Sequence, residues 1–78
     1  MDIVKGRIVK AKAGRDKDKF FVVVDIYKST AYICDGKTRR IEKPKRKNVL
    51  HLAPTAEMAD EFNSNRKIRE ILKNYRGD

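Results

Sequence analysis

The 78-residue chain has few of the residues that small folds use for cross-links or metal binding. It contains one cysteine, Cys34, and one histidine, His51. A single cysteine cannot form an internal disulfide, and one Cys with one His does not reach the three protein ligands of a catalytic zinc site. We therefore expect a chain that folds without disulfides or zinc in a reducing compartment.

Long apolar runs are also missing. No stretch approaches the roughly 18 apolar residues that suggest a transmembrane helix. Residues 1–6 lack the apolar segment of a signal peptide. These absences predict a cytoplasmic protein that makes no membrane contact.

Groupings that carry catalysis are not found either. No Ser-His-Asp set, glycine-rich phosphate loop or pair of carboxylates at catalytic spacing is present. Asp16 and Asp18 offer oxygen ligands of the kind magnesium prefers, but the neighbouring cations offer them ion pairs instead. Cys34 has no base to activate it and is expected to be a small buried hydrophobe. We expect no enzyme and no cofactor.

Positive charge is what the chain has in excess, and it is unevenly distributed. Residues 1–53 carry 15 basic and 6 acidic residues, a net of +9, whereas residues 54–78 carry 5 of each. Most of the excess lies in two clusters, residues 5–19 and 37–47. Because cations that replace condensed counterions bind polyanions favourably, this pattern favours a nucleic-acid partner over a surface charged only for solubility.

The small number of aromatic residues indicates which kind of nucleic acid the chain would bind. Three Tyr, three Phe and no Trp are too few for a sequence-reading single-strand binder or for an aromatic cage around methyl-lysine. A basic surface with few stacking groups favours recognition of folded RNA by its shape and phosphates.

Strand patterns fill the first part of the chain. Residues 6–13 alternate apolar and basic side chains, with Lys10 and Lys12 on the outer face of a half-buried strand. Residues 20–26 are aromatic and β-branched on both faces, which predicts a central strand. Residues 30–34 form a third β-prone run.

Turn residues predict how these strands connect. Asp35-Gly36 predicts a type I′ hairpin, with residues 38–42 as the returning strand and Pro44 at its end or edge. Residues 45–47 would extend as a basic finger, and residues 48–52 would form a last short strand. Five short strands joined by tight turns predict a mainly β fold, a small barrel.

After Pro54 the pattern becomes helical. Thr55 is a plausible N-cap, and Met58 and Phe62 lie four residues apart on one helical face. Residues 63–65 are a break or a second cap, so the segment is either one kinked helix or two short ones. The expected apolar stripe that packs on the barrel is Ile68, Ile71, Leu72 and Tyr75. The predicted division is a barrel at residues 1–53 and a helical segment at residues 54–78.

Residues 6–26, GRIVKAKAGRDKDKFFVVVDI, resemble a KOW motif, the strand–loop–strand signature of several ribosomal proteins and transcription elongation factors. The likeness is to single-KOW large-subunit ribosomal proteins of archaea and eukaryotes and to their small bacterial relatives. Residues 43–47, the Asp35-Gly36 turn and residues 51–55 resemble the same group. The resemblance covers about residues 6–55.

This resemblance implies an SH3-like β-barrel whose loop at residues 14–19 contacts ribosomal RNA. Family members usually have glycine where this chain has Asp18. Aspartate tolerates left-handed backbone better than most residues, so the turn can form, but its carboxylate lies beside the expected phosphate.

The expected function is that of an RNA-binding protein of the translation machinery, a component or accessory factor of the large ribosomal subunit. The alternative is a protein-interaction module that docks on ribosomal or other proteins through its helical tail. The chain is expected to be monomeric when free. Tyr27 and Tyr32 are the candidates for base stacking. The expected RNA-binding residues are Lys10, Lys12, Gly14, Arg15, Lys17, Lys19, Arg39, Arg40, Lys43, Lys45, Arg46 and Lys47.

Overall fold

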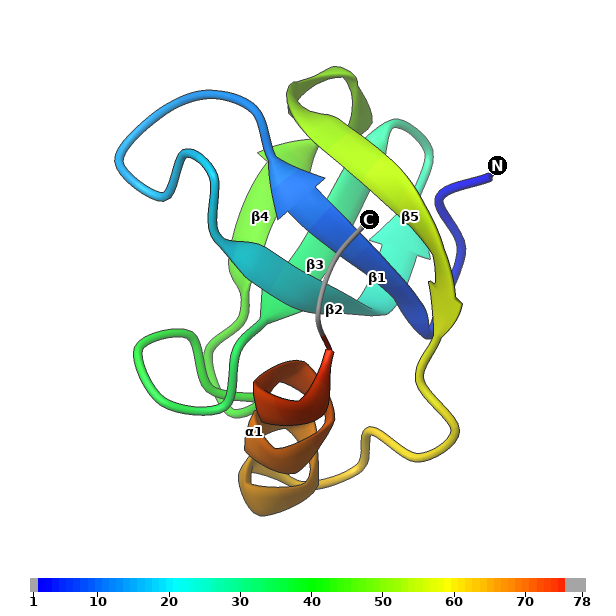
Figure 1. The fold of residues 1–78 in the computed structure, drawn as a ribbon. Coiled ribbons are helices and arrows are strands. Elements are labelled where there is room, and N and C mark those ends of the chain that lie inside the picture. The colour runs from blue at the N-terminus through cyan, green and yellow to red at the C-terminus, as the bar shows by residue number, and fades with distance from the viewer. Residues whose placement is uncertain (1, 76–78) are drawn as a thin grey trace.

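The structure is a computed structural model that describes residues 2–75, and it consists of five antiparallel strands and one α-helix (Figure 1). The expected mainly β fold with a C-terminal helix is confirmed. In chain order the elements are β1 (Arg7–Ala11), β2 (Phe20–Tyr27), β3 (Thr30–Cys34), β4 (Lys45–Asn48), the 3-10 turn η1 (Val49–His51), β5 (Leu52–Met58) and α1 (Asn65–Asn74).

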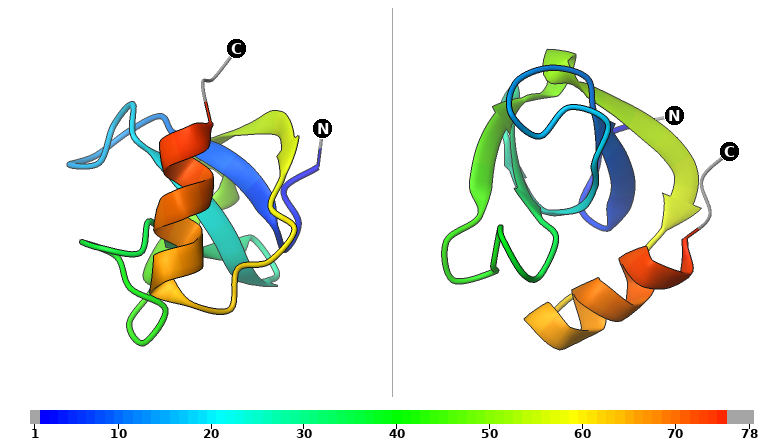
Figure 2. Two further views of the ribbon diagram at one scale, coloured as in Figure 1. Left: turned by 60° about the horizontal axis from the view of Figure 1, so that its bottom comes forward. Right: turned by 60° about the vertical axis from the view of Figure 1, so that its left-hand side comes forward.

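All five strands belong to one sheet in the order β4-β3-β2-β1-β5. The sheet is strongly curled (Figure 2) but is not closed, because the edge strands β4 and β5 are not paired with each other within the described residues. Both edges resist further pairing. Pro54 removes a donor from β5, and β4 is only four residues long with three cations.

The middle of the sheet is buried on both faces, as the sequence predicts for residues 20–26. Phe21 and Val23 point to one face, and Val22 points to the other, and all three are fully buried. The register of β2 shifts at a bulge between Val23 and Asp25, where it pairs with β3. Beyond this bulge β2 is more exposed, with Asp25 and Tyr27 exposed and Ile26 half-buried.

Two apolar cores lie on the two faces of the sheet. The first contains Val9, Ala11, Phe21, Val23, Ala31, Ile33 and Leu52. The second contains Ile8, Val22, Cys34 and Ala59, and it is covered by α1 through Ile68 (Figure 2). Burial of a side chain such as Ile68 contributes on the order of 1.5–3 kcal/mol. The helix is therefore an integral layer of the fold.

Helix α1 confirms the predicted stripe but begins later than expected. Ser64 is its N-cap, and the Ser64 hydroxyl accepts a hydrogen bond from the Lys67 amide at 3.1 Å. Ile71, Leu72 and Tyr75 pack against the second core beside Ile68. Residues 63–65 thus precede and begin the only α-helix in residues 2–75, with Ser64 as the cap and Asn65 as the first helical residue.

The expected N-cap at Thr55 is wrong, because Thr55 is a buried residue of β5. Its hydroxyl donates to the Ile8 carbonyl at 2.7 Å, which suits a β-branched residue in a strand. Met58 also lies in β5, so it shares no helical face with Phe62. The expected division between residues 53 and 54 falls inside β5, and residues 76–78 of the expected helical segment lie outside the described residues.

The expected hairpin at Asp35-Gly36 is also wrong. The Asp35 carboxylate accepts hydrogen bonds from the amides of Lys37 and Arg39, and these bonds close a loop in place of a two-residue turn. Only Gly36 has a positive φ, at 83°, whereas a type I′ turn needs two such residues. Residues 38–42 form no strand.

The returning strand is β4, which begins after Pro44. The expected basic finger at residues 45–47 is therefore the edge strand of the sheet. Residues 49–51, expected within a strand, form η1 because the Asn48 side chain accepts from the Leu50 amide at 2.9 Å.

The first strand is shorter than residues 6–13. Its outer face carries Ile8 and Lys10, and Ile8 is buried under α1. Lys12 lies beyond the strand end. The expected cationic outer face of β1 is thus reduced to Lys10.

Candidate nucleic-acid interface

Two loops from different parts of the sequence lie on the same side of the molecule. The β1–β2 loop (residues 12–19) and the β3–β4 loop (residues 35–44) both project on the side of β4 in Figure 1. Together with β4 they hold most of the expected RNA-binding residues. We call residues 12–19 and 37–47 the basic surface.

An ion pair joins the two loops. Asp16, only 5% exposed, accepts hydrogen bonds from Nε and Nη2 of Arg39 at 3.2 and 2.9 Å. A second link runs from the Lys47 ammonium to the Ala13 carbonyl at 3.0 Å. Asp16 was expected to pair with a cation close to it in the sequence, but its partner is Arg39, 23 residues away. Arg39 and Lys47 therefore hold the surface together, in addition to contributing charge.

The β1–β2 loop is closed largely by its own backbone. The Asp18 amide donates to the Ala11 carbonyl at 2.8 Å, and the Lys19 amide donates to the Asp16 carbonyl at 3.0 Å. Asp18 has a φ of 71°, so the left-handed conformation expected at this position is confirmed. Its carboxylate lies 3.9 Å from the Lys10 ammonium, which also sits 5.8 Å from the Phe20 ring centre.

The β3–β4 loop is held by α1. Arg69 donates from Nη1 to the Gly36 carbonyl at 2.7 Å. Asn65 accepts from the Ile41 amide at 2.8 Å and donates to the Glu42 carboxylate at 2.6 Å. The hydrogen bond from Asn65 lowers the pKa of Glu42 below its usual value. The helix thus fixes three points along this basic loop.

The expected RNA-binding residues differ in whether their charged groups already have a partner within the protein. Lys10, Arg39, Arg40 and Lys47 each have a partner within the molecule, and for Arg40 it is the exposed carboxylate of Glu42 at 3.3 Å. Gly14 is exposed and has a φ of 83°. In residues 2–75 the cations of the surface without an ion pair or hydrogen bond through their charged groups are Lys12, Arg15, Lys17, Lys19, Lys37, Lys43, Lys45 and Arg46.

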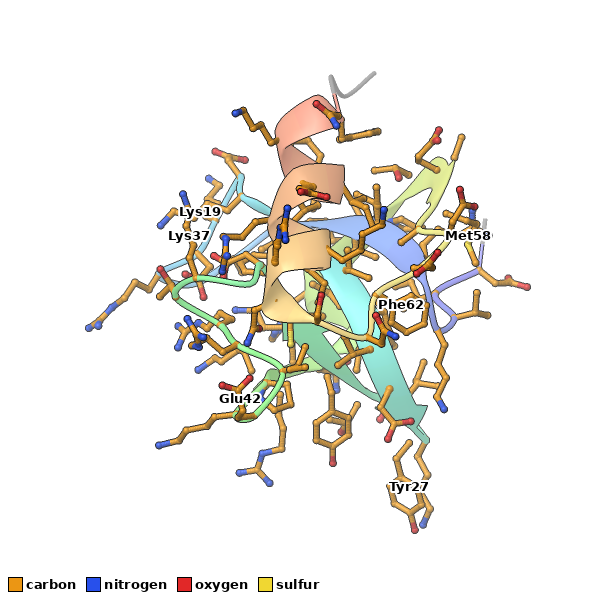
Figure 3. The ribbon with its side chains drawn as sticks, turned by 90° about the horizontal axis from the view of Figure 1, so that it is seen from below. Lys19, Tyr27, Lys37, Glu42, Met58 and Phe62 are labelled. Atoms are coloured by element: carbon orange, nitrogen blue, oxygen red, sulfur yellow. The ribbon has the colours of Figure 1, made fainter. Side chains whose placement is uncertain are left out.

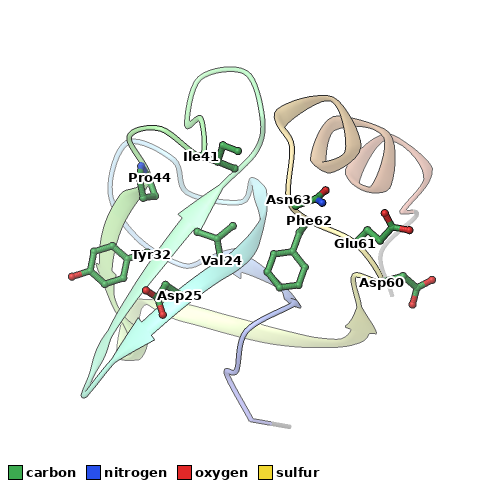
Figure 4. A pocket seen from close by; sticks show the side chains of 9 residues that line it. All are labelled: Val24, Asp25, Tyr32, Ile41, Pro44, Asp60, Glu61, Phe62 and Asn63. Atoms are coloured by element: carbon green, nitrogen blue, oxygen red, sulfur yellow. The ribbon is translucent and has the colours of Figure 1, made fainter.

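Only one of the two candidates for base stacking lies beside these cations, because Tyr32 is directly opposite Arg46 in the pairing of β3 with β4. Tyr27 is at the end of β2 away from the two loops, 64% exposed, with the Lys28 ammonium 5.4 Å from its ring centre (Figure 3). Tyr32 is half-buried and lines a hollow on the helix-covered side of the sheet (Figure 4). The basic surface is therefore suited mainly to phosphates, with Tyr32 beside Arg46 as the candidate for base stacking at its edge.

The hollow around Tyr32 has a different chemistry from the basic surface. Its apolar wall combines Val24, Ile41 and Phe62 with Pro44 (Figure 4). Asp25, Asp60 and Glu61 stand along its rim. An apolar floor with acidic edges suits a cationic protein segment and repels phosphate.

The remaining features are possible metal ligands, the single cysteine and the helices. Residues 2–75 contain no group of three or more His, Cys, Asp or Glu side chains that could hold a metal ion. Cys34 is fully buried, as expected, and burial, followed by the charge of Asp35, raises the pKa of its thiol to about 11. None of the helical structure in residues 2–75 is long and apolar enough to cross a membrane.

The residues that the sequence did not reveal are those that hold the loops. Asn65 and Arg69 lie in the segment described only as neutral, and Asp16 was not matched to Arg39. Counting the charged residues in shorter segments of residues 54–78 indicates the basic character of the helix. Residues 54–65 carry three acidic and no basic residues, whereas residues 66–75 carry four basic residues and one acidic residue. The tail is thus an acidic connection followed by a basic helix.

Comparison of the chain with protein-family models gave no match, and comparison with curated protein sequences gave none either. The likeness to KOW motifs therefore rests on the residues quoted above.

Proposed function

We propose that this chain is an RNA-binding protein of the translation machinery, which acts in the cytoplasm at the large ribosomal subunit as a component or accessory factor. The basic surface would contact phosphates of folded ribosomal RNA. The observation that carries this proposal is the linkage of the two basic loops by the Asp16–Arg39 ion pair and the Lys47 hydrogen bond. A preorganised array of cations loses less conformational freedom on binding than separate flexible loops do.

The strand order is compatible with a KOW-type, SH3-like barrel that is open between its edge strands. In this proposal β1, the β1–β2 loop and β2 form the KOW unit, and Asp18 occupies its glycine position. The positive φ of Asp18 supports that assignment, because the turn needs a residue tolerant of this conformation. The resemblance to KOW motifs implies ribosomal RNA, and the positive charge of the basic surface supports binding to a polyanion.

The salt dependence of binding tests the proposal. With about six phosphate contacts to a structured ribosomal RNA fragment, the slope of log affinity against log salt is expected to be roughly −4 to −5. Arg15→Ala with Lys17→Ala should make that slope shallower by roughly 1.5 to 2, because two free cations are lost. A flat salt dependence would overturn the proposal, as would equal affinity for a random DNA duplex at physiological salt.

A matched control removes the same charge elsewhere. Lys5 pairs with Asp25, and Lys28 lies over Tyr27 at the end of β2 away from the loops. Lys5→Ala with Lys28→Ala should leave the slope nearly unchanged. If both double variants change it alike, net charge governs binding and the basic surface is not a site.

The hollow in Figure 4 supports a second candidate function, docking on another protein. Its apolar wall and the carboxylates of Asp25, Asp60 and Glu61 suit a segment with both cationic and apolar side chains. This differs from the expected docking through the helix stripe, since Ile68, Ile71 and Leu72 are packed on the sheet. Asp60→Lys with Glu61→Lys should release nuclease-resistant partners in a pull-down and leave RNA affinity no weaker. Loss of every partner on nuclease treatment of the wild type would rule this function out.

A further inference from the structure

A groove lies between α1 and the start of β2, and it shares Lys19 and Lys37 with the basic surface. One wall is formed by α1, and the opposite wall by the ends of the β1–β2 and β3–β4 loops. Lys19 and Lys37 both line the groove and lie on the same side of the helix (Figure 3). The groove is therefore continuous with the basic surface through these two lysines.

The edges of the groove are strongly cationic. Its basic residues are Lys19, Lys37, Arg66, Arg69 and Lys73, against the carboxylates of Asp35 and Glu70. Both carboxylates are engaged, because Asp35 accepts from two loop amides and Glu70 lies 3.5 Å from Arg66. Arg69 is bound to the Gly36 carbonyl and fixes the width of the groove. Among the described residues, the ammonium groups of Lys19, Lys37 and Lys73 have no ion pair or hydrogen bond.

The floor of the groove is apolar. Phe20 and Leu72 line it from the sheet and from the helix, and both are half-buried. The Phe20 ring is held by an edge contact with Tyr75, whose ring centre is 5.1 Å away. A cationic rim over an aromatic and aliphatic floor matches a nucleotide, which has an anionic phosphate and a flat apolar base.

We infer that this groove is a second RNA-contact site, which takes an unpaired nucleotide or short single-stranded segment that adjoins the folded RNA. The phosphates lie against Lys19, Lys37 and Lys73, and a base covers Phe20 and Leu72. This inference rests on the proposed function, because the same RNA occupies the basic surface. It gives α1 a binding role in addition to the packing on the sheet that its apolar stripe predicts.

An acidic peptide is the competing occupant, and the groove itself favours RNA. A peptide of acidic residues would satisfy the cationic rim but would leave Phe20 and Leu72 in contact with polar chain. The free lysines also continue from the basic surface to the groove, as expected where one RNA backbone passes from one to the other.

The test compares two RNA probes. One is a blunt hairpin of about 16 base pairs. The other is the same hairpin with a 3′ tail of about five uridines, and the tail should raise wild-type affinity roughly tenfold at low salt. Lys37→Glu with Lys73→Glu should reduce the gain from the tail to less than about twofold, because phosphates of the tail are repelled. Lys5→Glu with Lys28→Glu carries the same change of charge and should keep the full gain.

The ratio of the two affinities separates this inference from the proposed function. Absence of a gain from the tail in the wild type overturns the groove assignment, and so does a gain that persists in the groove variant. If a pentaglutamate peptide abolishes the gain as effectively as free pentauridine, charge alone is responsible and the nucleotide site is refuted. A blunt hairpin that does not bind at all overturns the proposed function instead, since it carries no tail.

Discussion

The β1–β2 loop and the β3–β4 loop carry the same charges, four cations and two carboxylates each, yet different parts of the chain hold them. The first is closed by its own backbone hydrogen bonds between residues 11 and 19. The second depends on Asn65 and Arg69 of α1. The β1–β2 loop is therefore the locally encoded loop, whereas the β3–β4 loop has hydrogen bonds of its own within residues 35–43 and is also held by the helix.

This difference predicts how RNA binding responds to substitutions in the two loops. A change in the β1–β2 loop should act locally on affinity. A change at the contact between the β3–β4 loop and α1 should affect stability first and affinity second, because the loop loses its support. The variants below test that contrast in order of decreasing effect.

The largest effect is expected at Gly36. Its φ is 83°, and an added Cβ would collide with the backbone oxygen of Asn65 and approach Arg69. Backbone cannot move aside as a side chain can, so Gly36→Ala should lower the free energy of unfolding by about 3 kcal/mol. Chemical denaturation measures this loss.

Gly14→Ala is the matched control in the other loop. Gly14 has the same φ of 83°, but the atom that an added Cβ would meet is the Lys47 ammonium at the end of a flexible side chain, which would move and weaken its hydrogen bond to the Ala13 carbonyl. The expected loss is the conformational strain and part of this hydrogen bond, about 1.5 kcal/mol. Equal losses for the two variants would show that helix docking does not distinguish the loops.

The same difference explains which elements sequence patterns could predict. β2 and β3 follow from runs of β-branched residues, and the helix stripe follows from spacing alone, so these are local properties. Asp35-Gly36 was misassigned because the Asp35 carboxylate binds the amides of Lys37 and Arg39, and because the loop also forms hydrogen bonds to residues 65 and 69. Local turn preferences do not include the partners in α1, and they predict a tight hairpin.

Thr55 and Asp16 show the same limit. Thr55 is a residue type that often caps helices, but its hydroxyl donates a hydrogen bond to the Ile8 carbonyl, 47 residues away. The ion pair of Asp16 with Arg39 joins two clusters that were each recognised as basic. The clusters could be predicted from the sequence, whereas their linkage depends on strand order.

The ion pair between the loops gives the second prediction. Arg39→Ala leaves the buried Asp16 carboxylate without its two hydrogen bonds and should destabilise the protein by roughly 2 kcal/mol. For a domain of this size that corresponds to a fall of about 10 °C in Tm. Arg40→Ala removes only an exposed pair with Glu42 and should change stability by less than about 0.5 kcal/mol.

RNA binding should respond to the same two variants differently. Arg40→Ala should weaken all RNAs alike through one lost phosphate contact, whereas Arg39→Ala should also separate the two loops. Thermal melts and salt titrations of both proteins provide the measurement. Identical melting temperatures would contradict the role of Arg39 as a link.

Asn65 gives a smaller effect with a pH signature. Asn65→Ala removes the partners of the Ile41 amide and of Glu42 and should cost on the order of 1 kcal/mol. The pKa of Glu42 is lowered in the folded state, so its contribution is present above the unfolded pKa and is lost as pH falls through the folded value.

In the Asn65→Ala variant the Glu42 pKa should rise toward its ordinary range, and this part of the acid dependence should shrink. An NMR titration of the Glu42 carboxyl carbon in both proteins measures the change. Asn65→Asp is a useful comparison, because it retains the acceptor for the Ile41 amide but places a second carboxylate beside Glu42. An unchanged Glu42 pKa in Asn65→Ala would contradict the contact.

The smallest effect is expected at Asp18, where the locally encoded loop departs from the KOW pattern. Asparagine also tolerates the observed φ of 71°, so Asp18→Asn should change stability by less than about 0.5 kcal/mol. It removes a negative charge and frees Lys10, which should tighten RNA binding roughly twofold to threefold at low salt. Asp18→Ala removes the same charge but should cost about 1 kcal/mol, because alanine is strained at positive φ. Comparing the two variants separates the effect of the lost charge on RNA affinity from the effect of backbone strain on stability. Weaker RNA binding by Asp18→Asn would mean that this carboxylate itself contacts the RNA.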